Sequence, residues 1–484
     1  MAIEVSALVS ALEIQGLFGH KYLHIDMDDS GAGARKGRRL SLLYGNNGSG
    51  KTTALKLLWH ALSPADTEGH RNEIARTPFE SFTIYLCRGD VIKFTKDEKL
   101  GNGFTVVVTN GEKRLAEQVY RETPDGRVKA VSLHTKHSAL HVRNQRALFE
   151  LETEVPESLI SDEYAREVYL RIQGMTETRP DDFVKYLKQL GTGPYMLADD
   201  RKIYGDDIEG KHRNRKRRAT FDDLHEQEAT AVSGVPAELN TALRRAYEMI
   251  QRMVITGNVS GSRGSNNVYL GILEKISQTD SSEADATTRE KLRERLDEIV
   301  DKTAEYSTYG LMPTIRRESF SEVLNRTPDS KLGVAEDVMQ PFIEAQQARL
   351  DALSGVAKLL STLTREVNRF FQSSGKKVRY RMHEGLKVYS EEGNRLQPED
   401  LSSGERQILL LLLNTVLARE STRLFLIDEP ELSLNVKWQR QLMHALLALT
   451  EGAPVQFVVA THSIEVITGH RDALAKVAPR SMDS

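Results

Sequence analysis

The chain has 484 residues, with 66 basic and 69 acidic side chains and a net charge of −3. Its length allows several domains, and its near-neutral charge excludes a global field that favours nucleic acid. Cys87 is the sole cysteine, so we expect no internal disulfide and a reducing cytoplasm. The N-terminus lacks the basic n-region of a signal peptide, and the longest apolar run, which ends at Leu413, is too short to span a bilayer, so we expect no membrane association.

The first informative motif is a glycine-rich loop between an apolar strand and a helix. Leu40–Tyr44 predicts a buried strand, and the apolar spacing of Thr53–Leu62 predicts a helix. The residues between them fit the phosphate-binding pattern G-x-x-x-x-G-K-[ST]. In such a loop Lys51 reaches the β- and γ-phosphates of ATP, and the hydroxyl of Thr52 binds Mg²⁺. The predicted nucleotide-binding residues are Gly45, Asn46, Asn47, Gly48, Ser49, Gly50, Lys51, Thr52 and Thr53.

The next segment has the character of an antiparallel sheet. Residues 81–86, 91–94 and 104–108 are β-rich and are separated by turn signals. No glutamine occurs between Thr52 and Glu117, and the sequence around Gln118 (RLAEQVY) predicts a helix.

Beyond residue 150 the chain becomes helical. Residues 238–254, 283–302 and 334–371 carry periodic apolar residues among charges, and the last of these allows an arm of roughly 50 Å. Gly257–Asn267 predicts a flexible loop. The basic run Lys211–Arg218 fits a solvated loop, a nucleic-acid contact or a site for an acidic protein.

Three further motifs follow a predicted hairpin at Lys376–Tyr389. The first is the segment LSSGE at 401–405, which precedes an apolar helix. The second is the strand 424–427, which ends in Asp428 and Glu429, and the third is the strand 455–460, which precedes His462. Because ligands bind at the carboxyl edge of open α/β sheets, we expect Asp428 to hold the metal with Thr52, and Glu429 to polarise the attacking water.

These four motifs, in this order, resemble those of the ABC-type ATPases. The resemblance implies that Lys51, Glu429 and His462 are catalytic, and that His462 contacts the γ-phosphate. It also implies that the signature residues Ser402, Ser403 and Gly404 cap the ATP held by a second copy, which makes the protein a homo-oligomer joined through ATP. Asn435 stands where the family usually has an aspartate. Phe18 and Tyr22 are candidates for stacking on adenine, although packing in the core or in a turn is favoured for both.

The helical insert resembles the SMC-like branch of this superfamily. The D-E-P-E-x-S-L pattern and the compact insert resemble standalone ATPases of bacterial anti-phage defence, with the PARIS-type ATPase favoured over the Septu-type and the OLD-like ATPases. No acidic nuclease constellation follows His462. The resemblance therefore implies a separate effector nuclease subunit and a phage trigger protein. The alternative is an SMC-like ATPase that tethers or repairs DNA, and a transporter ATPase is disfavoured.

Together these features predict an α/β fold of the ABC-type P-loop head, a mixed sheet with an antiparallel β layer, interrupted by a helical and partly coiled-coil insert. We expect an N-terminal lobe at 1–150, the insert at 151–375 and a C-terminal lobe at 376–484.

Overall fold

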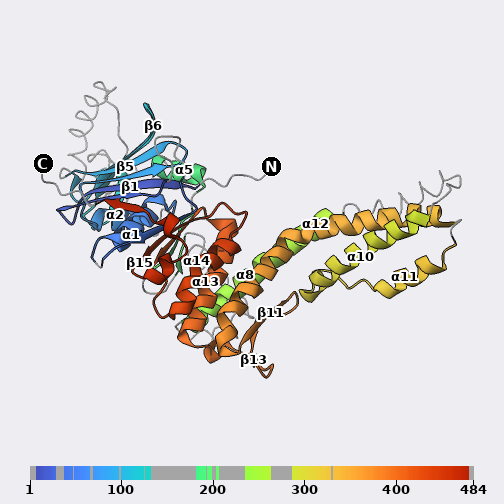
Figure 1. The fold of residues 1–484 in the computed structure, drawn as a ribbon. Coiled ribbons are helices and arrows are strands. Elements are labelled where there is room, and N and C mark those ends of the chain that lie inside the picture. The colour runs from blue at the N-terminus through green and yellow to red at the C-terminus, as the bar shows by residue number, and fades with distance from the viewer. Residues whose placement is uncertain are drawn as a thin grey trace, which may run out of the picture. The chain divides into compact units, whose positions relative to one another are not determined.

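The computed structural model describes residues 7–28, 37–46, 48–65, 69–97, 100–124, 126–131, 181–191, 193–198, 203–205, 235–262, 286–328 and 331–478. The chain forms two compact units (Figure 1). The first consists of residues 1–219, 418–443 and 452–484, and the second of residues 220–417 and 444–451.

The first unit contains an eight-stranded antiparallel sheet. In spatial order its strands are β16 (Lys476–Ala478), β2 (Lys21–Asp26), β1 (Val9–Leu17), β4 (Ser81–Leu86), β5 (Asp90–Lys96), β6 (Phe104–Asn110), β7 (Lys113–Glu122) and β8 (Val128–Val131). This sheet is the antiparallel layer predicted from the sequence. Gln118 lies in β7, so the helix predicted around it is wrong. The burial of Ala116, Gln118 and Tyr120 alternates with more exposed neighbours, which is the period of a strand.

The second sheet of this unit is mainly parallel. Its order is β10 (Ile203–Tyr204), β9 (Tyr195–Leu197), β14 (Leu424–Asp428), β15 (Gln456–Thr461) and β3 (Leu40–Tyr44). All but β10 run parallel to their neighbours. Every residue of β14 and β15 is buried, as expected for strands covered on both faces.

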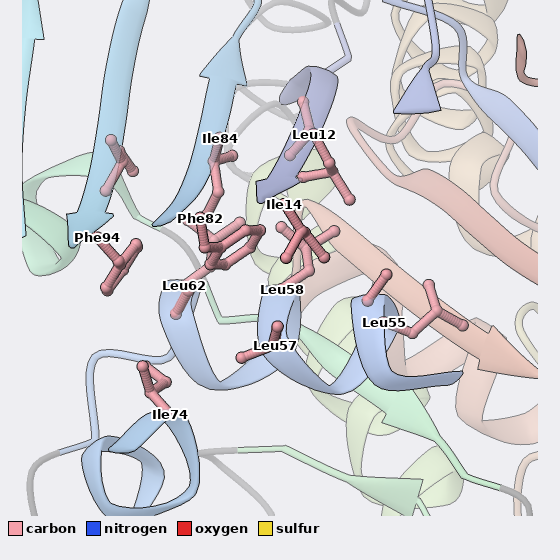
Figure 2. Close-up of a cluster of buried hydrophobic side chains, with 14 of the residues drawn as sticks. Leu12, Ile14, Leu55, Leu57, Leu58, Leu62, Ile74, Phe82, Ile84 and Phe94 are labelled. Atoms are coloured by element: carbon pink, nitrogen blue, oxygen red, sulfur yellow. The ribbon is translucent and has the colours of Figure 1, made fainter. Parts of the chain in front are cut away.

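Helix α1 (Lys51–Leu62) supplies a large part of the hydrophobic core of the first unit. Its residues Leu55, Leu58 and Leu62 are buried among Ile14 of β1 and Phe82 of β4 (Figure 2). The helices α2 (His70–Arg76), α5 (Asp182–Leu190) and α15 (Ile464–Ile467) also belong to this unit, together with parts of α13 (Ser403–Ser421) and α14 (Val436–Leu449). Because burial of apolar surface dominates folding, this packing fixes the helix that follows the phosphate-binding loop.

A buried glutamine joins the two sheets. Gln456 of β15 accepts hydrogen bonds through Oε1 from the backbone N–H groups of Leu8 (3.0 Å) and Val9 (2.8 Å). Its Nε2 donates to the carbonyl oxygens of Val9 (2.8 Å) and Arg38 (3.1 Å). These four bonds satisfy the amide and hold the parallel sheet to the antiparallel layer.

The second unit is helical, as predicted. It contains α8 (Val235–Ser262), α10 (Ala286–Thr308), α11 (Arg317–Arg326) and the 40-residue helix α12 (Leu332–Phe371), which spans about 60 Å at 1.5 Å per residue. Helix α12 packs along α8 and α10. A three-stranded sheet of β11 (Lys377–Arg381), β12 (Gly385–Tyr389) and β13 (Arg395–Leu396) contains the predicted hairpin.

The expected loop at 257–267 is wrong over its first part, because α8 continues through Gly257 to Ser262. A Cβ atom at Gly257 would lie 2.9 Å from the carbonyl oxygen of Ala352 in α12. The glycine therefore permits close packing of the two helices. The rest of that segment and the basic run 211–218 lie outside the described residues.

The α/β class of the prediction is confirmed, with an antiparallel layer beside a parallel sheet and a helical insert. Within the part of the chain that the structure describes, none of the helices combines the length and hydrophobicity that crossing a bilayer requires.

Candidate functional site

Three neighbouring strands of the parallel sheet carry the motifs identified in the sequence. Strand β15 lies between β14 and β3, with Asp428 in register with Ala460, and Thr461 with Tyr44. Because the strands are parallel, the segments that follow all three leave the sheet at one edge. This is where ligands bind in open α/β sheets.

The loop between β3 and α1 curls around the end of its own lysine. Gly48 (φ 74°) and Gly50 (φ 94°) adopt left-handed conformations that favour glycine. Lys51 Nζ donates hydrogen bonds to the carbonyl oxygens of Gly45 (2.8 Å) and Asn46 (2.9 Å) and to Ser49 Oγ (3.2 Å). The ammonium group thus lies inside the loop that would surround a phosphate. Asn47 lies outside the described residues, and Thr53 is half-buried in α1.

The predicted metal ligands lie next to each other. Thr52 Oγ1 donates to Asp428 Oδ1 at 3.1 Å, although the two residues are 376 positions apart in the sequence. Asp428 is buried, with 2 % of its surface exposed. A hydroxyl and a carboxylate at this distance fit Mg²⁺, which in P-loop proteins is held by few protein groups and by phosphate oxygens.

The charges around Lys51 also fit a divalent cation. Burial lowers the pKa of Lys51, while three nearby carboxylates, those of Glu429, Asp428 and Glu431, act in the opposite direction. Three carboxylates therefore face one ammonium group. A bound cation offsets this excess of negative charge.

Glu429 lies beside the histidine that follows β15. Glu429 Oε1 is 3.2 Å from His462 Nε2, and 29 % of each side chain is exposed. The Glu429 backbone has a φ of 47°, a left-handed conformation that is costly for this residue type. Its N–H donates to the carbonyl oxygen of Ala460 at 2.9 Å, which fixes it to β15. Strain of this kind concentrates at functional sites.

Glu431 has no role among the residues predicted from the sequence, yet its side chain joins the segment after β14 to the end of β15 and the segment after it. Glu431 Oε1 accepts hydrogen bonds from Thr461 Oγ1 (2.7 Å), His462 N (2.7 Å) and Ser463 N (3.1 Å). The third acidic residue of D-E-P-E, which is Glu431 itself, is the only signal of this role in the sequence.

The signature segment LSSGE lies in the second unit and opens helix α13. Ser402 Oγ accepts a hydrogen bond from Glu405 N (3.3 Å), and Glu405 Oε2 accepts from Ser402 N (2.7 Å) and from Lys376 Nζ (2.7 Å). Burial acts to raise the pKa of Glu405, but the hydrogen bonds from Lys376 and Ser402 hold it below its ordinary value. Ser402 is thus engaged in a reciprocal cap of its own helix. Ser402 and Ser403 are exposed, whereas Gly404 is buried.

The remaining candidates have local roles in the structure. Asn435 Oδ1 accepts a hydrogen bond from Trp438 N (2.9 Å) and caps α14. Phe18 is 45 % exposed at the turn between β1 and β2 and has a φ of 56°. The hydroxyl of Tyr22 donates to Glu13 (3.1 Å).

Comparison with known proteins gives one family match. Residues 308–468 match the family described as "AAA domain, putative AbiEii toxin, Type IV TA system". The matched segment contains LSSGE, the Asp428-Glu429 pair and His462, but not the phosphate-binding loop. A search of curated proteins returned no match.

Solved structures with some similarity are heads of SMC proteins. One is the Smc head domain from Pyrococcus furiosus with an extended coiled coil, bound to the C-terminal domain of ScpA. It is 13 % identical, with 98 % of this chain and 96 % of that chain covered and a TM-score of 0.32. An SmcHead bound to the C-winged helix domain of ScpA is 11 % identical, with 98 % of each chain covered and a TM-score of 0.33. The SMC head domain from Thermotoga maritima is 16 % identical, with 25 % and 47 % covered and a TM-score of 0.19.

These TM-scores establish no shared fold by themselves, and the fold class rests on the two sheets and the helical unit described above. The phosphate-binding loop, the acidic end of β14 and the histidine after β15 meet at one sheet edge. With the family match over residues 308–468, this arrangement indicates a P-loop ATPase site for ATP.

Proposed function

We propose that the protein binds Mg²⁺–ATP and hydrolyses it to ADP and phosphate. The observation that carries the proposal is the pair of contacts Thr52–Asp428 and Glu429–His462 beside Lys51. Lys51 binds the β- and γ-phosphates, Glu429 accepts the proton of the attacking water, and His462 orients the γ-phosphate. Mg²⁺ held at Thr52 and Asp428 supplies charge neutralisation of the phosphate oxygens when bound.

The proposal extends to two copies that share each ATP. The exposed hydroxyl of Ser403, at the start of α13, is available to the γ-phosphate bound by another copy. Large apolar side chains are also exposed on the segments next to Glu429 and His462: Leu432 (37 %), Val436 (52 %) and Ile464 (65 %). Exposed apolar groups beside a catalytic site support a protein partner there, and we assign it to a second copy of this chain.

The test is ATP turnover together with the mass of the particle. Purified protein should release phosphate from ATP only with Mg²⁺, and Glu429→Gln should form ATP-dependent dimers or larger even-numbered assemblies in analytical ultracentrifugation. Wild-type protein that binds ATP and Mg²⁺ without any turnover would contradict the hydrolysis proposal. A Glu429→Gln variant that stays monomeric at saturating ATP would contradict the pairing.

We further propose that this ATPase regulates a partner nuclease in anti-phage defence in the cytoplasm and responds to a phage protein. The matched family has a description that names a toxin, and this supports the role. In toxin systems and in nuclease-based phage defence alike, one component holds a harmful enzyme inactive until it is needed. A PARIS-type ATPase is our first choice, before a Septu-type or an OLD-like ATPase. Co-expression with the product of a neighbouring gene, followed by co-purification and phage challenge, tests this role. Equal phage titres with the intact pair and with a Lys51→Ala pair would argue against it.

The alternative is an SMC-like ATPase that tethers or repairs DNA. The long helix α12, packed along α8 and α10, favours it, since such arms span distances along DNA. The alternative predicts that duplex DNA stimulates ATP turnover at low salt and that binding weakens steeply as salt rises. Replacing Lys211–Arg218 by neutral residues should then remove the stimulation. No stimulation at low salt would eliminate this alternative.

A further inference from the structure

Three hydrogen-bond donors from consecutive residues converge on one oxygen of Glu431. They are the hydroxyl of Thr461 and the backbone N–H groups of His462 and Ser463, at 2.7, 2.7 and 3.1 Å from Oε1. Hydrogen bonds to an ionised acceptor are stronger than neutral ones. The carboxylate of Glu431 therefore fixes the backbone of His462, whose side chain lies next to Glu429.

Gln439 of α14 closes this contact into a ring. Its Nε2 donates to the carbonyl oxygens of Glu431 (3.4 Å) and Leu434 (2.8 Å), and its Oε1 accepts from Ser463 Oγ (2.7 Å). The same Ser463 hydroxyl accepts from the N–H groups of Glu465 (3.1 Å) and Val466 (3.3 Å) and so caps α15. The loop 431–434, the start of α14 and the segment 461–463 are thus held as one hydrogen-bonded assembly, which we call the Glu431–Gln439–Ser463 ring.

We propose that Glu431 and Gln439 are positioning residues for hydrolysis, which act by holding His462 at its distance from Glu429. The inference rests on the proposed hydrolysis and adds to it a link from the loop 431–434 to the histidine. Because Leu432 on this loop is 37 % exposed, a partner that contacts this residue shifts the ring and with it His462.

A direct role in binding metal or nucleotide is the competing explanation for Glu431. Its Oε2 is buried and has no hydrogen-bond partner within the described residues. Its charge also acts on Lys51. The two roles differ in what they change: loss of a ligand weakens binding of ATP or Mg²⁺, whereas loss of a positioning residue lowers kcat and leaves binding unchanged.

The experiment compares Glu431→Ala, Glu431→Gln and Gln439→Ala with the control Arg440→Ala. Arg440 follows Gln439 on α14, and among the described residues its side chain pairs with Glu465 of α15 (2.5 Å) and makes no hydrogen bond to Glu431, Gln439 or Ser463. We expect Glu431→Ala to lower kcat by about 10²-fold with KM for ATP within about twofold, because small displacements of a catalytic group have effects of this size. Glu431→Gln keeps an acceptor oxygen and should recover part of this loss, and Arg440→Ala should match the wild type.

A double variant shows whether Glu431 acts through the histidine. If it does, Glu431→Ala combined with His462→Ala should be no slower than His462→Ala alone. Losses that multiply in the double variant would overturn the inference. So would a Glu431→Ala enzyme with wild-type kcat, or one whose defect is weaker binding of ATP or Mg²⁺.

Hydrogen exchange supplies a readout that needs no turnover. Amides of His462 and Ser463 should exchange faster in Glu431→Ala and in Gln439→Ala than in the wild type, while amides of β15 keep their protection. Unchanged exchange at both amides would overturn the inference even if no ATP hydrolysis is found. Absence of hydrolysis in the wild type, with faster exchange in the variants, would instead refute the proposed hydrolysis and leave the ring established.

Discussion

Glu429 Oε1 lies 3.2 Å from His462 Nε2, at the ends of two adjacent parallel strands. The carboxylate is set there by a left-handed backbone, and the histidine is set there by the hydrogen bonds of its own N–H and its neighbours to Glu431. The N–H of Glu429 also donates to Ala460 in β15, so Glu429 is held by the neighbouring strand and His462 by the segment that follows β14.

Glu429→Gln should retain ATP binding and lose hydrolysis. Removal of a general base costs about 10²–10⁴-fold in rate. Phosphate release in a single turnover measures the loss, and binding of a fluorescent ATP analogue checks that the site is intact. Turnover within a few-fold of the wild type would exclude Glu429 as the base.

Lys51→Ala should weaken ATP binding. Hydrogen bonds to charged groups contribute about 1.5–3 kcal/mol, which corresponds to a roughly 10–100-fold higher Kd. Lys56→Ala, on the same helix and outside the phosphate loop, is the matched control. Titration calorimetry measures both, and equal Kd values for the two variants would contradict the role of Lys51.

Glu429→Asn should stabilise the fold relative to Glu429→Ala. Asparagine tolerates the left-handed conformation at φ 47°, whereas alanine does not, and the difference is about 1 kcal/mol. Urea unfolding measures the free energy of both variants. A less stable Asn variant would show that the left-handed backbone at this position is not strained. Both variants should lack hydrolysis, so the difference in stability between them reports on the backbone alone.

The two signature serines should behave differently. Ser402 caps α13 through Glu405 N, so Ser402→Ala should lower the free energy of unfolding by about 1 kcal/mol. Ser403→Ala should leave stability unchanged, because the structure gives its hydroxyl no cap to make, and should slow hydrolysis. Urea unfolding and phosphate release separate the two effects. A Ser403→Ala enzyme with full activity would exclude its hydroxyl from the site.

Stability should fall in mild acid because of His60. Burial, followed by repulsion from His70, Arg71 and Lys56, lowers the pKa of His60 from 6.5 to about 3. The unfolded chain therefore binds a proton below pH 6.5 that the folded protein does not. This contribution to stability is complete above pH 6.5 and is lost as the pH falls toward 3, by roughly 2 kcal/mol at pH 5. Urea unfolding at pH 7.5 and pH 5 should show a smaller loss in His60→Asn, and an equal loss would contradict this account.

The sequence predicted the parts of the site that depend on local pattern. Strand β3 begins and ends as predicted, because its apolar run stops at the first glycine of the loop. Strand β14 ends at the acidic pair, because its apolar run stops there. The position of Thr52 beside Asp428 followed from the motifs once the strands were taken as parallel.

Other features depend on contacts that no local pattern records. Glu431 receives its donors from residues 30 to 32 positions away, so its role is visible only when β14 and β15 pair. Gly257 resembles a loop residue in the sequence, yet it lies within α8, where the absence of a side chain lets α12 approach closely. The segment around Gln118 contains too few residues to separate a helical from a strand period.

The most direct test of a site shared between two copies mixes two inactive variants. Ser403→Arg keeps the ATP-binding loop but blocks the signature, and Lys51→Ala keeps the signature but binds ATP weakly. In a pair that contains one copy of each variant, the loop of the Ser403→Arg copy faces the signature of the Lys51→Ala copy. This one site has both of its parts intact. We predict that the mixture hydrolyses ATP although neither variant does so alone. A mixture as inactive as its components, under conditions where the wild type turns over, would contradict the account.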